Sequence, residues 1–479
     1  MIILSIPFLS EKISHEFSEK FADELAYLEF RLDRQRKYYE FPKSIMNSKT
    51  IITIRDVSEC GERDIPFSDK IKYYEKVVTE HDCLVDLEIN NYQETSINPD
   101  NLILSFHDFS DTLQIEKFRK IIDRSNSIPS KFLKIAVKIN RYSELLEIRS
   151  LISESKKPVI FAGLGKLGKF SRLIYQQLGA VGTFIGLVLF PTATGQLNID
   201  EAKKYGMQNI SQETKIGGII GGKQVKKSLG ISFYNEYFRK NKIDAVYLPF
   251  VVEDFEDFWF WIENSNIDFY GFSITMPFKR EAGERKRETG KSGFFAFHRD
   301  SQKKEFSAVN LYLPKTNEFL NTDFNAFQKA FDYLQIKEKD KILIYGSGGT
   351  AETALYVLQD FFNVSVSSRN EKAGKELAAK YSVKFKSQGI LCRDNFDLVI
   401  NCTPVGMNNE DLLAILNIQL HAKIIDLPYS NQETPLIQKS EKDKIPFVDG
   451  KMFWKWQAEK QLKEFAAQIC ILKCNPNIC

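Results

Sequence analysis

The feature that most constrains the fold is a regular succession of short apolar segments in about the first 210 residues. Eight such segments alternate with longer stretches in which apolar residues recur at helical spacing. Alternating strands and helices predict an α/β architecture, and eight strands are the number that closes a (β/α)8 barrel. The expected strands are "MIILSIP", "LAYLEFRLD", "TIITIRD", "CLVDLEI", "LILSFHD", "FLKIAVKI", "PVIFAGLG" and "GTFIGLVL".

A second α/β unit is expected to begin near "TKIGGIIGG" at 214–222, without a long flexible linker before it. Within this unit, "KILIYGSGGTAETALYVLQDF" from 341 predicts a strand, a glycine turn and a helix, as in dinucleotide-binding folds. The sequence therefore predicts three parts: a barrel over 1–212, a subdomain over 213–320 that a carboxy-terminal helix at about 451–479 completes, and a nucleotide-binding subdomain over 321–450.

Composition and charge argue against several classes of protein. Hydrophobic residues make up 43% of the 479 residues and charged residues 27%, as in ordinary globular proteins. The 66 basic and 63 acidic side chains leave a formal charge of +3, too small to indicate nucleic acid or an acidic membrane as a partner. The longest nearly apolar run, 181–190, is too short to cross a bilayer, and the amino terminus lacks a basic leader. We therefore expect a cytoplasmic protein.

The cysteines give no sign of a disulfide framework or a metal site. Seven of them, an odd number, are scattered along the chain, which favours a reducing compartment. Cys470, Cys474 and Cys479 lie close together near the end, but no histidine is near them and no CxxC pair occurs. No metal is therefore predicted.

Lys134 lies inside a segment that otherwise predicts a buried strand. In "FLKIAVKI" the neighbours Leu133, Ile135 and Val137 would face the helices of a barrel, so Lys134 would face its interior. On an open sheet Lys134 would simply point into solvent. Inside a barrel, its amine would be a nucleophile able to form a Schiff base with a ketone. Other expected strands would direct polar residues into the same cavity, namely Glu29, Arg31, Asp33, Arg55, Glu88 and His107.

Taken together, these motifs resemble those of type I 3-dehydroquinate dehydratase. "ExRxD", "TxR", "DLE", "HDF", "KIAV", the "SR" pair at 171–172 and "TATGQ" at 192–196 occur in order over nearly all of residues 1–205. The resemblance implies that Lys134 forms an imine with the C3 ketone of 3-dehydroquinate, that His107 is the general acid and base, and that Glu88 orients His107. An isolated histidine at this position would more simply be structural.

The same resemblance implies the residues that bind the substrate. Arg172 corresponds to an arginine that holds the substrate carboxylate, for which a planar guanidinium is well suited. The other implied ligands are Glu29, Arg31, Arg55, Thr192 and Gln196. Thr192 and Thr194 stand where the family has serine and proline, a difference expected to affect motion of the closing loop more than the chemistry.

The glycine turn predicts a dinucleotide site. Gly346, Gly348 and Gly349 would let the backbone approach a pyrophosphate at a helix amino terminus, although a tight turn without a ligand is the alternative. The next expected strand ends about twenty residues later with Ser368, Arg369 and Asn370, where an enzyme that uses NAD would have a carboxylate. Arg369 suits a ribose 2′-phosphate, which predicts NADP, unless it is a solvated surface residue. Further cofactor contacts are expected at Thr350, Ala351, Thr403 and Gly450.

Residues 215–470 resemble shikimate dehydrogenase. "SITMPFK" at 273–279 ends with Lys279, which matches the catalytic lysine, and "NTD" at 321–323 supplies its partner Asp323. Either residue alone would more often be an ordinary surface charge. The resemblance implies further substrate ligands at Thr275, Asn310, Tyr429 and Gln457.

Two segments depart from the pattern of that family. Two serines separated by one residue usually bind the substrate carboxylate, and we align them with Lys226 and Ser228. A lysine can replace a hydroxyl through its charge but with different geometry, so either tighter carboxylate binding or a different substrate is expected. In addition, the charged segment 284–306 lengthens the connection between Lys279 and Asp323.

The two resemblances together imply one chain with two consecutive activities. The first part would dehydrate 3-dehydroquinate to 3-dehydroshikimate, and the second would reduce that product to shikimate with NADPH and without a metal. Two alternatives remain: a second half that acts on quinate or another polyol acid, and a second half that binds a nucleotide without catalysis.

Overall fold

The computed structural model describes residues 1–7, 25–34, 41, 43–189, 192, 195–288, 308–361, 363–418, 421–429 and 432–470. The chain divides into two compact units. The first contains Met1–Ile216, Ile231–Leu248 and Val252–Asp268, and the second contains Gly217–Gly230, Pro249–Val251 and the chain from Phe269 onward. The domain limits expected from the sequence remain predictions. Thr194, Cys474 and Cys479 lie outside the described residues, as does most of the segment 284–306 beyond Glu288.

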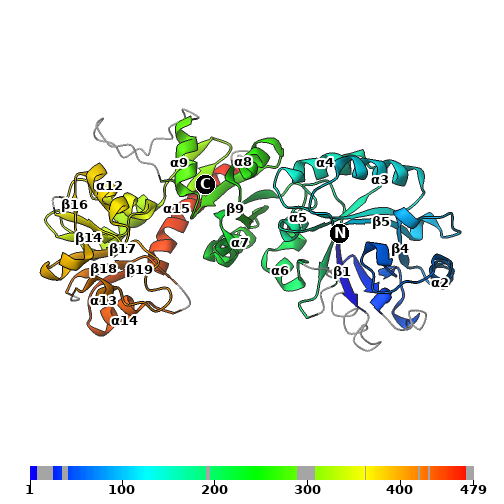
Figure 1. The fold of residues 1–479 in the computed structure, drawn as a ribbon, viewed down its shortest axis with the longest axis horizontal. Helices are drawn as coiled ribbons and strands as arrows, with labels where there is room; N and C mark the ends of the chain where they lie inside the picture. The colour runs from blue at the N-terminus through cyan, green and yellow to red at the C-terminus, as the bar shows by residue number, and fades with distance from the viewer. Residues whose placement is uncertain are drawn as a thin grey trace. The chain divides into compact units, whose positions relative to one another are not determined.

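The first unit contains the predicted eight-stranded parallel barrel (Figure 1). Its strands pair in the order β7-β6-β5-β4-β3-β2-β1-β8, and a bridge between Ile160 and Gly182 joins the two ends of this sheet. The strands are β1 (Ile2–Pro7), β2 (Tyr27–Arg31), β3 (Thr50–Thr53), β4 (Leu84–Glu88), β5 (Leu102–Asp108), β6 (Phe132–Lys138), β7 (Val159–Leu164) and β8 (Thr183–Gly186). The helices that follow these strands include α2 (Phe67–Glu80), α3 (Ile115–Ser127), α4 (Glu144–Glu154), α5 (Gly168–Leu173) and α6 (Ile199–Lys204).

A five-stranded sheet follows the barrel in the sequence. Its strands have the order β10-β9-β11-β12-β13, and β12 is antiparallel to both β11 and β13. They are β9 (Lys215–Gly221), β10 (Ala245–Val251), β11 (Phe269–Ile274), β12 (Leu311–Leu313) and β13 (Glu318–Leu320). The associated helices are η8 (Lys223–Lys227), α7 (Leu229–Lys240), α8 (Phe255–Asn264) and α9 (Lys279–Glu288).

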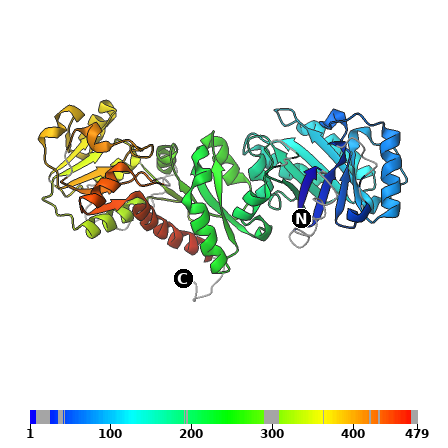
Figure 2. The ribbon, with the colours of Figure 1, turned by 90° about the horizontal axis from the view of Figure 1, so that it is seen from below.

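A six-stranded parallel sheet contains the predicted nucleotide-binding segment. Its order, β16-β15-β14-β17-β18-β19, reverses direction at β14, and ligands of such doubly wound sheets bind at this switch point. The strands are β14 (Ile342–Tyr345), β15 (Val364–Ser367), β16 (Lys384–Phe385), β17 (Leu398–Asn401), β18 (Lys423–Asp426) and β19 (Phe447–Asp449). Helices α10 (Asp323–Leu334), α11 (Gly349–Val357), α12 (Glu371–Tyr381), α13 (Leu412–Leu416) and α14 (Pro435–Lys442) surround it (Figures 1 and 2).

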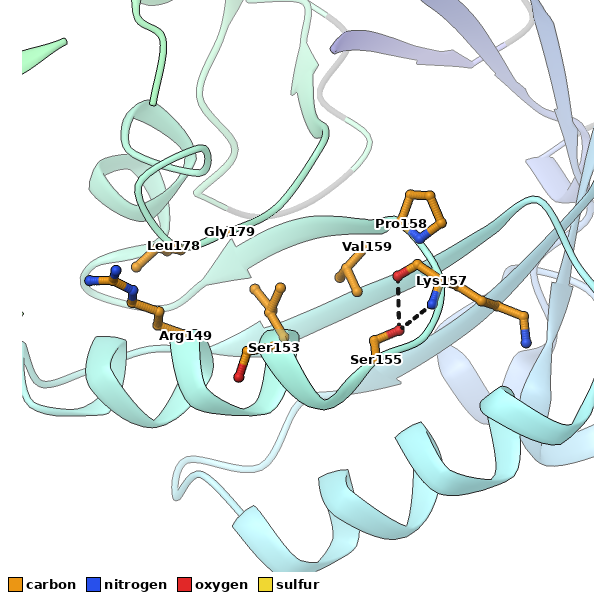
Figure 3. A pocket seen from close by; sticks show the side chains of 9 residues that line it. Arg149, Ser153, Ser155, Lys157, Pro158, Val159, Leu178 and Gly179 are labelled. Atoms are coloured by element: carbon orange, nitrogen blue, oxygen red, sulfur yellow. Dashed lines mark hydrogen bonds between the residues drawn. The ribbon is translucent and has the colours of Figure 1, made fainter. Parts of the chain in front are cut away.

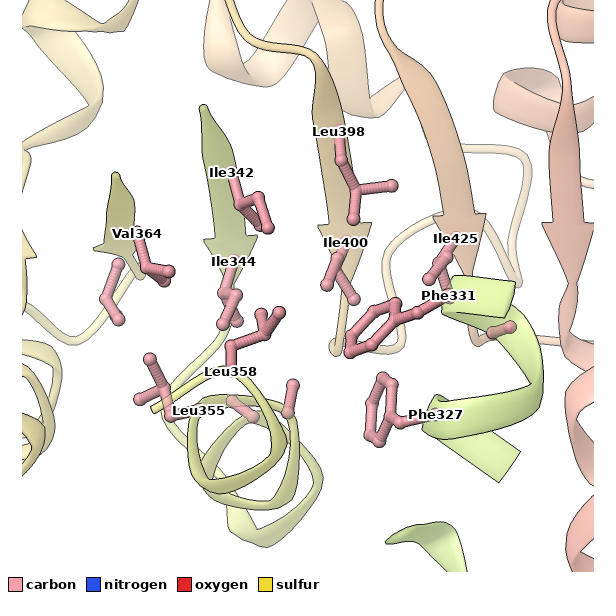
Figure 4. Close-up of a cluster of buried hydrophobic side chains, with 14 of the residues drawn as sticks. Phe327, Phe331, Ile342, Ile344, Leu355, Leu358, Val364, Leu398, Ile400 and Ile425 are labelled. Carbon is pink, nitrogen blue, oxygen red and sulfur yellow. The ribbon is translucent and has the colours of Figure 1, made fainter. Parts of the chain in front are cut away.

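Period-two alternation explains how this sheet is covered on both faces. Ile342 and Ile344 of β14 point to a core shared with Phe327 and Phe331 of α10, as Figure 4 shows. Leu343, between the two isoleucines, points to the opposite core. Because both faces of β14 are apolar, its sequence is a continuous hydrophobic run, as expected for a parallel strand between two helical layers.

The last helix links the two sheets of the second unit. Helix α15 (Gly450–Cys470) starts directly after β19 and packs against α10 and then β11. Its Phe465 lies edge-on to Tyr270 of β11, at 5.2 Å between ring centroids. Helix α15 therefore runs from the six-stranded sheet back to β11 of the five-stranded sheet.

In the described part of the chain, no helix combines the length and the apolar character that a membrane crossing requires.

Candidate active sites

The barrel interior is layered. Ile3, Ile51, Leu84, Ile103 and Phe132 belong to one buried apolar cluster. Two residues further along each strand, on the same face, the chain has polar side chains. These are Ser5, Thr53, Asp86, Ser105 and Lys134, and all are buried. The polar groups therefore lie above an apolar plug, toward the carboxyl ends of the strands, where (β/α)8 enzymes carry their sites.

Lys134 lies in this polar layer, as predicted. Its side chain is 7% exposed, and its Nζ lies 2.9 Å from both Glu29 Oε1 and Asp86 Oδ2. The ammonium also lies 4.0 Å from the ring centroid of Phe184, in the apolar plug. Burial opposes ionisation of Asp86, but the charges of Arg55 and Lys134 outweigh it and hold the pKa of that carboxyl well below its usual range. The lysine thus faces the interior and is held by two carboxylates.

The structure corrects the prediction for Glu88. The carboxylate that contacts His107 belongs to Glu59, whose Oε2 lies 2.7 Å from Nδ1 of the imidazole. Glu88 instead accepts bonds from Arg55 Nη1 at 2.9 Å and from the buried Lys70. The prediction was wrong because it considered only strand residues, whereas Glu59 ends the short helix η4 (Val57–Glu59) after β3.

Burial shifts both members of the His107–Glu59 pair toward their neutral forms. Burial, reinforced by the positive charges of Arg55 and Lys134, lowers the pKa of His107 well below its usual value. Burial also raises the pKa of Glu59, to about 7, although the charge of Arg55 opposes this shift. A neutral imidazole that donates through Nδ1 to Glu59 keeps Nε2 available as a proton acceptor.

The arginines of the barrel differ in their partners. Arg55 donates to Asp86, Glu88 and Ser105, so its charge is balanced inside the protein. Arg31 forms a bidentate salt bridge with Asp33, in which Nε and Nη2 each lie 2.8 Å from a carboxylate oxygen. Asp86 and Ser105 were absent from the predicted site, whereas Asp33 was expected there as a polar partner next to Arg31. The signal for the first two was available, since each stands two residues before a predicted site residue on its strand.

Arg172 is buried without a carboxylate partner in the described part of the chain. It is 1% exposed, and its guanidinium donates to the backbone oxygens of Gly163, at 2.9 Å, and of Phe184. Burial lowers the pKa of Arg172 to about 10. A buried cation that meets only carbonyl oxygens is well suited to an anionic ligand, because the ligand would supply the missing charge.

Thr192 and Gln196, which follow β8, are linked to Lys134 through Ser5, a residue that was not predicted. Thr192 Oγ1 donates to Ser5 Oγ at 2.9 Å, and Thr192 N lies 3.3 Å from Gln196 Oε1. Ser5 in turn donates to Glu29, which also accepts from Lys134. The predicted residues Thr192, Gln196, Glu29 and Lys134 are thus joined in one hydrogen-bonded chain through Ser5 on β1.

A cavity of about 290 Å³ in the first unit lies away from this cluster. Figure 3 shows Pro158 and Val159, at the amino-terminal end of β7, between Arg149 and Lys157. Because it opens at the end of the barrel opposite the carboxyl ends of the strands, it does not belong to the site around Lys134.

The second unit brings Lys279 and Asp323 together, as predicted. Lys279 Nζ lies 2.9 Å from Asp323 Oδ2, and Asn310 Nδ2 donates to Asp323 Oδ1 at 2.8 Å. Lys279 opens α9 and Asp323 opens α10, so two helix ends place the pair. The charged segment between them therefore does not prevent this contact.

Residues of α15 extend this network. Gln457 Oε1 accepts from Thr322 Oγ1 at 3.1 Å, and the Thr322 N–H donates to Asn310 Oδ1 at 2.8 Å. One turn later, the buried Gln461 accepts from Ser273 Oγ at 2.6 Å and donates to the backbone oxygen of Asn310 at 3.1 Å. Gln461 was not predicted, since polar residues on helices are usually exposed.

The predicted carboxylate ligands of this unit are less well connected to the pair. Lys226 is exposed on η8, and Ser228 Oγ accepts a local bond from Gly230 N at 3.2 Å. The Thr275 N–H donates to Ile220 O, between the two strand ends. Tyr429 keeps 36% of its surface exposed. Its pKa is nevertheless raised, first by partial burial of the side chain and then by the negative charge of Asp323.

The turn between β14 and α11 has the shape that a dinucleotide needs. Gly346 has φ +134°, which disfavours other residues, and a Cβ on Gly349 would lie 2.9 Å from Ala308 Cβ. Nothing lies within 4 Å of the place where a Cβ on Gly348 would be, so that side of the turn is open. Gly348 is the N-cap of α11 and offers no side-chain cap, which leaves N–H groups around Thr350 and Ala351 for a ligand.

The remaining predicted cofactor residues lie at neighbouring strand ends. Ser368 is buried and Arg369 is exposed, directly after β15, and Asn370 caps α12 through Ala373 N. Thr403 donates to Asn401 Oδ1 at 2.7 Å after β17. A Cβ on Gly450 would lie 2.4 Å from Leu427 O, so only glycine fits where α15 meets the chain after β18.

Two family models match different parts of the chain. Residues 18–210 match the family model of type I 3-dehydroquinase, and residues 220–286 match that of the shikimate dehydrogenase substrate binding domain. Shikimate dehydrogenase (NADP(+)) of Pyrococcus furiosus is 30% identical over 247 residues, which cover 50% of this chain and 86% of the relative. The Clostridium botulinum (strain Hall) enzyme of the same name is 27% identical, with 50% and 92% covered.

A longer relative spans both halves. The bifunctional 3-dehydroquinate dehydratase/shikimate dehydrogenase of Arabidopsis thaliana is 23% identical over 393 residues, which cover 76% of this chain and 63% of the relative. A barrel with a buried, carboxylate-bound lysine, joined to an α/β unit with a dinucleotide-binding turn, defines a two-domain enzyme that combines a lyase with an oxidoreductase. The chain belongs to the shikimate dehydrogenase family, and a type I 3-dehydroquinase domain precedes that part.

Proposed function

We propose that this chain catalyses two consecutive reactions of the shikimate pathway. The barrel dehydrates 3-dehydroquinate to 3-dehydroshikimate, and the second unit reduces this product to shikimate with NADPH. The observation that carries the proposal is the buried Lys134, bound by Glu29 and Asp86 inside a barrel that matches the type I 3-dehydroquinase model. The presence of Lys279, Asp323 and Asn310 in one network supports the second reaction.

In the barrel, Lys134 attacks the C3 ketone of the substrate and water leaves to form an imine. The imine acts as an electron sink, so the C2 proton can pass to Nε2 of the neutral His107. The resulting enamine expels the C1 hydroxyl, which takes up the proton from His107, and hydrolysis of the imine frees the product and Lys134. Glu59 holds the imidazole through Nδ1 while the proton moves.

Arg172 binds the substrate carboxylate in this proposal. Its guanidinium is buried and meets only carbonyl oxygens among the described residues, so an incoming carboxylate neutralises a charge that the fold leaves uncompensated. Thr192, Gln196 and Arg31 then bind hydroxyl groups around the ring. The hydrogen-bonded chain through Ser5 connects this part of the site to Glu29 and Lys134.

In the second unit, Lys279 and Asp323 hold and deliver the proton that the reduced carbonyl oxygen receives. Asn310 fixes one oxygen of Asp323, which leaves the other for Lys279. Gln457 and Tyr429 contact the substrate from α15 and from the chain after β18. Lys226 and Ser228 lie near the substrate carboxylate in this proposal, although neither contacts the Lys279 network in the structure.

NADP fits the turn after β14. The open side of Gly348 and the uncapped start of α11 would hold the pyrophosphate, and Arg369 at the end of β15 would hold the 2′-phosphate. When bound, the reduced cofactor supplies the hydride. Thr403 and Gly450 would line the path toward the substrate.

The compartment is part of the proposal as well. The cysteines among the described residues, Cys60, Cys83, Cys392, Cys402 and Cys470, are free thiols. Free thiols and small-molecule substrates are consistent with a reducing, cytoplasmic setting.

A coupled assay tests both activities at once. Purified protein receives 3-dehydroquinate and NADPH, and the absorbance of the enone and of the nicotinamide are followed separately. Appearance of the enone followed by consumption of NADPH is expected. An enone that accumulates while NADPH stays constant would contradict the second activity, and addition of quinate with NADP+ would then test a changed substrate.

A further inference from the structure

The first turn of α9 connects the two halves of the reductase site. Lys279 and Arg280 are consecutive, and on a helix consecutive side chains point about 100° apart. Lys279 points to Asp323, while Arg280 Nη2 donates to the backbone oxygen of Ser347 at 3.3 Å. Ser347 belongs to the glycine turn between β14 and α11. The start of α9, which lies beside the five-stranded sheet, thus contacts the glycine turn of the six-stranded sheet.

The surroundings of Arg280 favour an anion. The side chain is exposed, and its bond to a single carbonyl oxygen engages one of the five N–H donors of the guanidinium. The turn it touches is open beside Gly348 and leads into a helix start without a side-chain cap. Backbone N–H groups and a guanidinium therefore converge on one place, and this combination suits a phosphate group.

We propose that Arg280 binds the pyrophosphate of the dinucleotide cofactor and thereby fixes Lys279 for the reaction. The inference rests on the proposed reductase function and extends it. A pyrophosphate ligand next to Lys279 makes cofactor binding order the first turn of α9. The cofactor then influences the proton-transferring pair through the chain itself.

Arg280 and Arg369 bind different parts of the cofactor in this proposal. NADPH and NADH share the pyrophosphate, whereas only NADPH carries the 2′-phosphate. Loss of a pyrophosphate ligand therefore weakens both nucleotides by a similar factor. Loss of a 2′-phosphate ligand weakens NADPH alone, which makes Arg369 the matched control for Arg280.

The experiment measures dissociation constants of NADPH and NADH by fluorescence titration, without substrate, for the full chain and for Arg280→Gln, Arg280→Lys and Arg369→Gln. Arg280→Gln is expected to weaken both nucleotides about tenfold or more, since a charge-assisted bond is lost. Arg280→Lys should lie between, because it keeps the charge but loses the planar fork. Arg369→Gln should weaken NADPH and leave NADH nearly unchanged. Thermal unfolding checks that each variant is folded.

Three results would overturn the inference in distinguishable ways. If the unaltered protein binds NADPH and Arg280→Gln binds both nucleotides equally well, Arg280 is not a ligand while the proposed function stands. If Arg280→Gln weakens NADPH only, Arg280 serves the 2′-phosphate instead of the pyrophosphate. If the unaltered protein binds neither nucleotide, the reductase proposal fails and the inference fails with it.

Discussion

The two sites of this chain are built in different ways. In the barrel, the polar side chains stand on neighbouring strands in a buried layer, and most of them already bond to one another, as Lys134 does with Glu29 and Asp86. In the second unit, the groups lie at the starts of helices and at the ends of strands of two sheets, as Lys279 and Asp323 do. Strand register therefore determines which side chains come together in the first site. In the second site, the packing of helix ends against one another determines this.

This difference has consequences for substitution. In a buried layer, removal of one charge leaves its partners uncompensated, so chemistry and stability change together. At the helix ends, 17% of the Lys279 side chain is accessible, although only 8% of Asp323 is. Removal of the Asp323 charge therefore leaves a lysine that solvent can still reach, so the change affects chemistry more than folding.

Lys134→Ala should have the largest effect. Dehydration of 3-dehydroquinate should become unmeasurable, because the amine proposed to form the imine is removed, while supplied 3-dehydroshikimate is still reduced. The variant should also lose about 3–5 kcal/mol of barrel stability, since Glu29 and Asp86 stay buried without a cation. Separate assays of the two reactions and urea unfolding measure both effects.

Lys134→Arg is the matched control for charge. It keeps a cation between the carboxylates but cannot form an imine, so it should retain more stability and equally little dehydration. Borohydride added with 3-dehydroquinate should attach substrate covalently to Lys134 in the unaltered protein only. Loss of both activities in Lys134→Ala, with the fold intact, would contradict two independent sites.

Asp323→Asn should show the opposite balance. Reduction should fall about a hundredfold or more, because the partner of Lys279 in proton transfer is lost, while dehydration continues. The amide can still accept from Asn310, so the melting temperature should change little. Turnover of 3-dehydroshikimate at saturating NADPH and a thermal scan test this, and a large loss of stability would remove the contrast drawn above.

Glu59→Gln should slow dehydration about tenfold to a hundredfold, because His107 loses the carboxylate at Nδ1. Burial raises the pKa of Glu59 to about 7, so dehydration should rise with pH through about 7 as this carboxyl ionises. The lowered pKa of His107 places its own titration below that range. A pH profile of kcat/KM should therefore lose its limb near pH 7 in Glu59→Gln.

Stability should respond to the same group with the opposite sign. Because the folded protein favours protonated Glu59, the contribution of this group to the free energy of unfolding is present at low pH and is lost as the pH rises through about 7. Glu88→Gln is the matched control, since Glu88 bonds Arg55 and Lys70 and not His107. A limb near pH 7 that disappears in Glu88→Gln instead would restore the assignment made from the sequence.

These residues also show how far sequence reasoning reaches. The eight strands and the inward orientation of Lys134 follow from period-two alternation, which depends only on local backbone geometry. Glu59 was not predicted because it lies in the short helix η4 after β3, where periodicity does not show which way a side chain points. Its partner His107 is also 48 residues away in the sequence. Gln461 was not predicted for a related reason, since its burial depends on where α15 packs. Contacts between distant loops and helix ends require the tertiary structure.

Lys226→Ser should have the smallest effect of these substitutions. Lys226 is exposed on η8 and forms no contact with the Lys279 network, so in the proposed site its charge would act on the substrate carboxylate through solvent. The Michaelis constant for 3-dehydroshikimate should rise about two- to fivefold with little change in turnover. Lys227→Ser, at the neighbouring exposed position, is the matched control. An equal shift in both variants would mean that the lysines act as a general positive surface, and no shift in either would remove Lys226 from the substrate site.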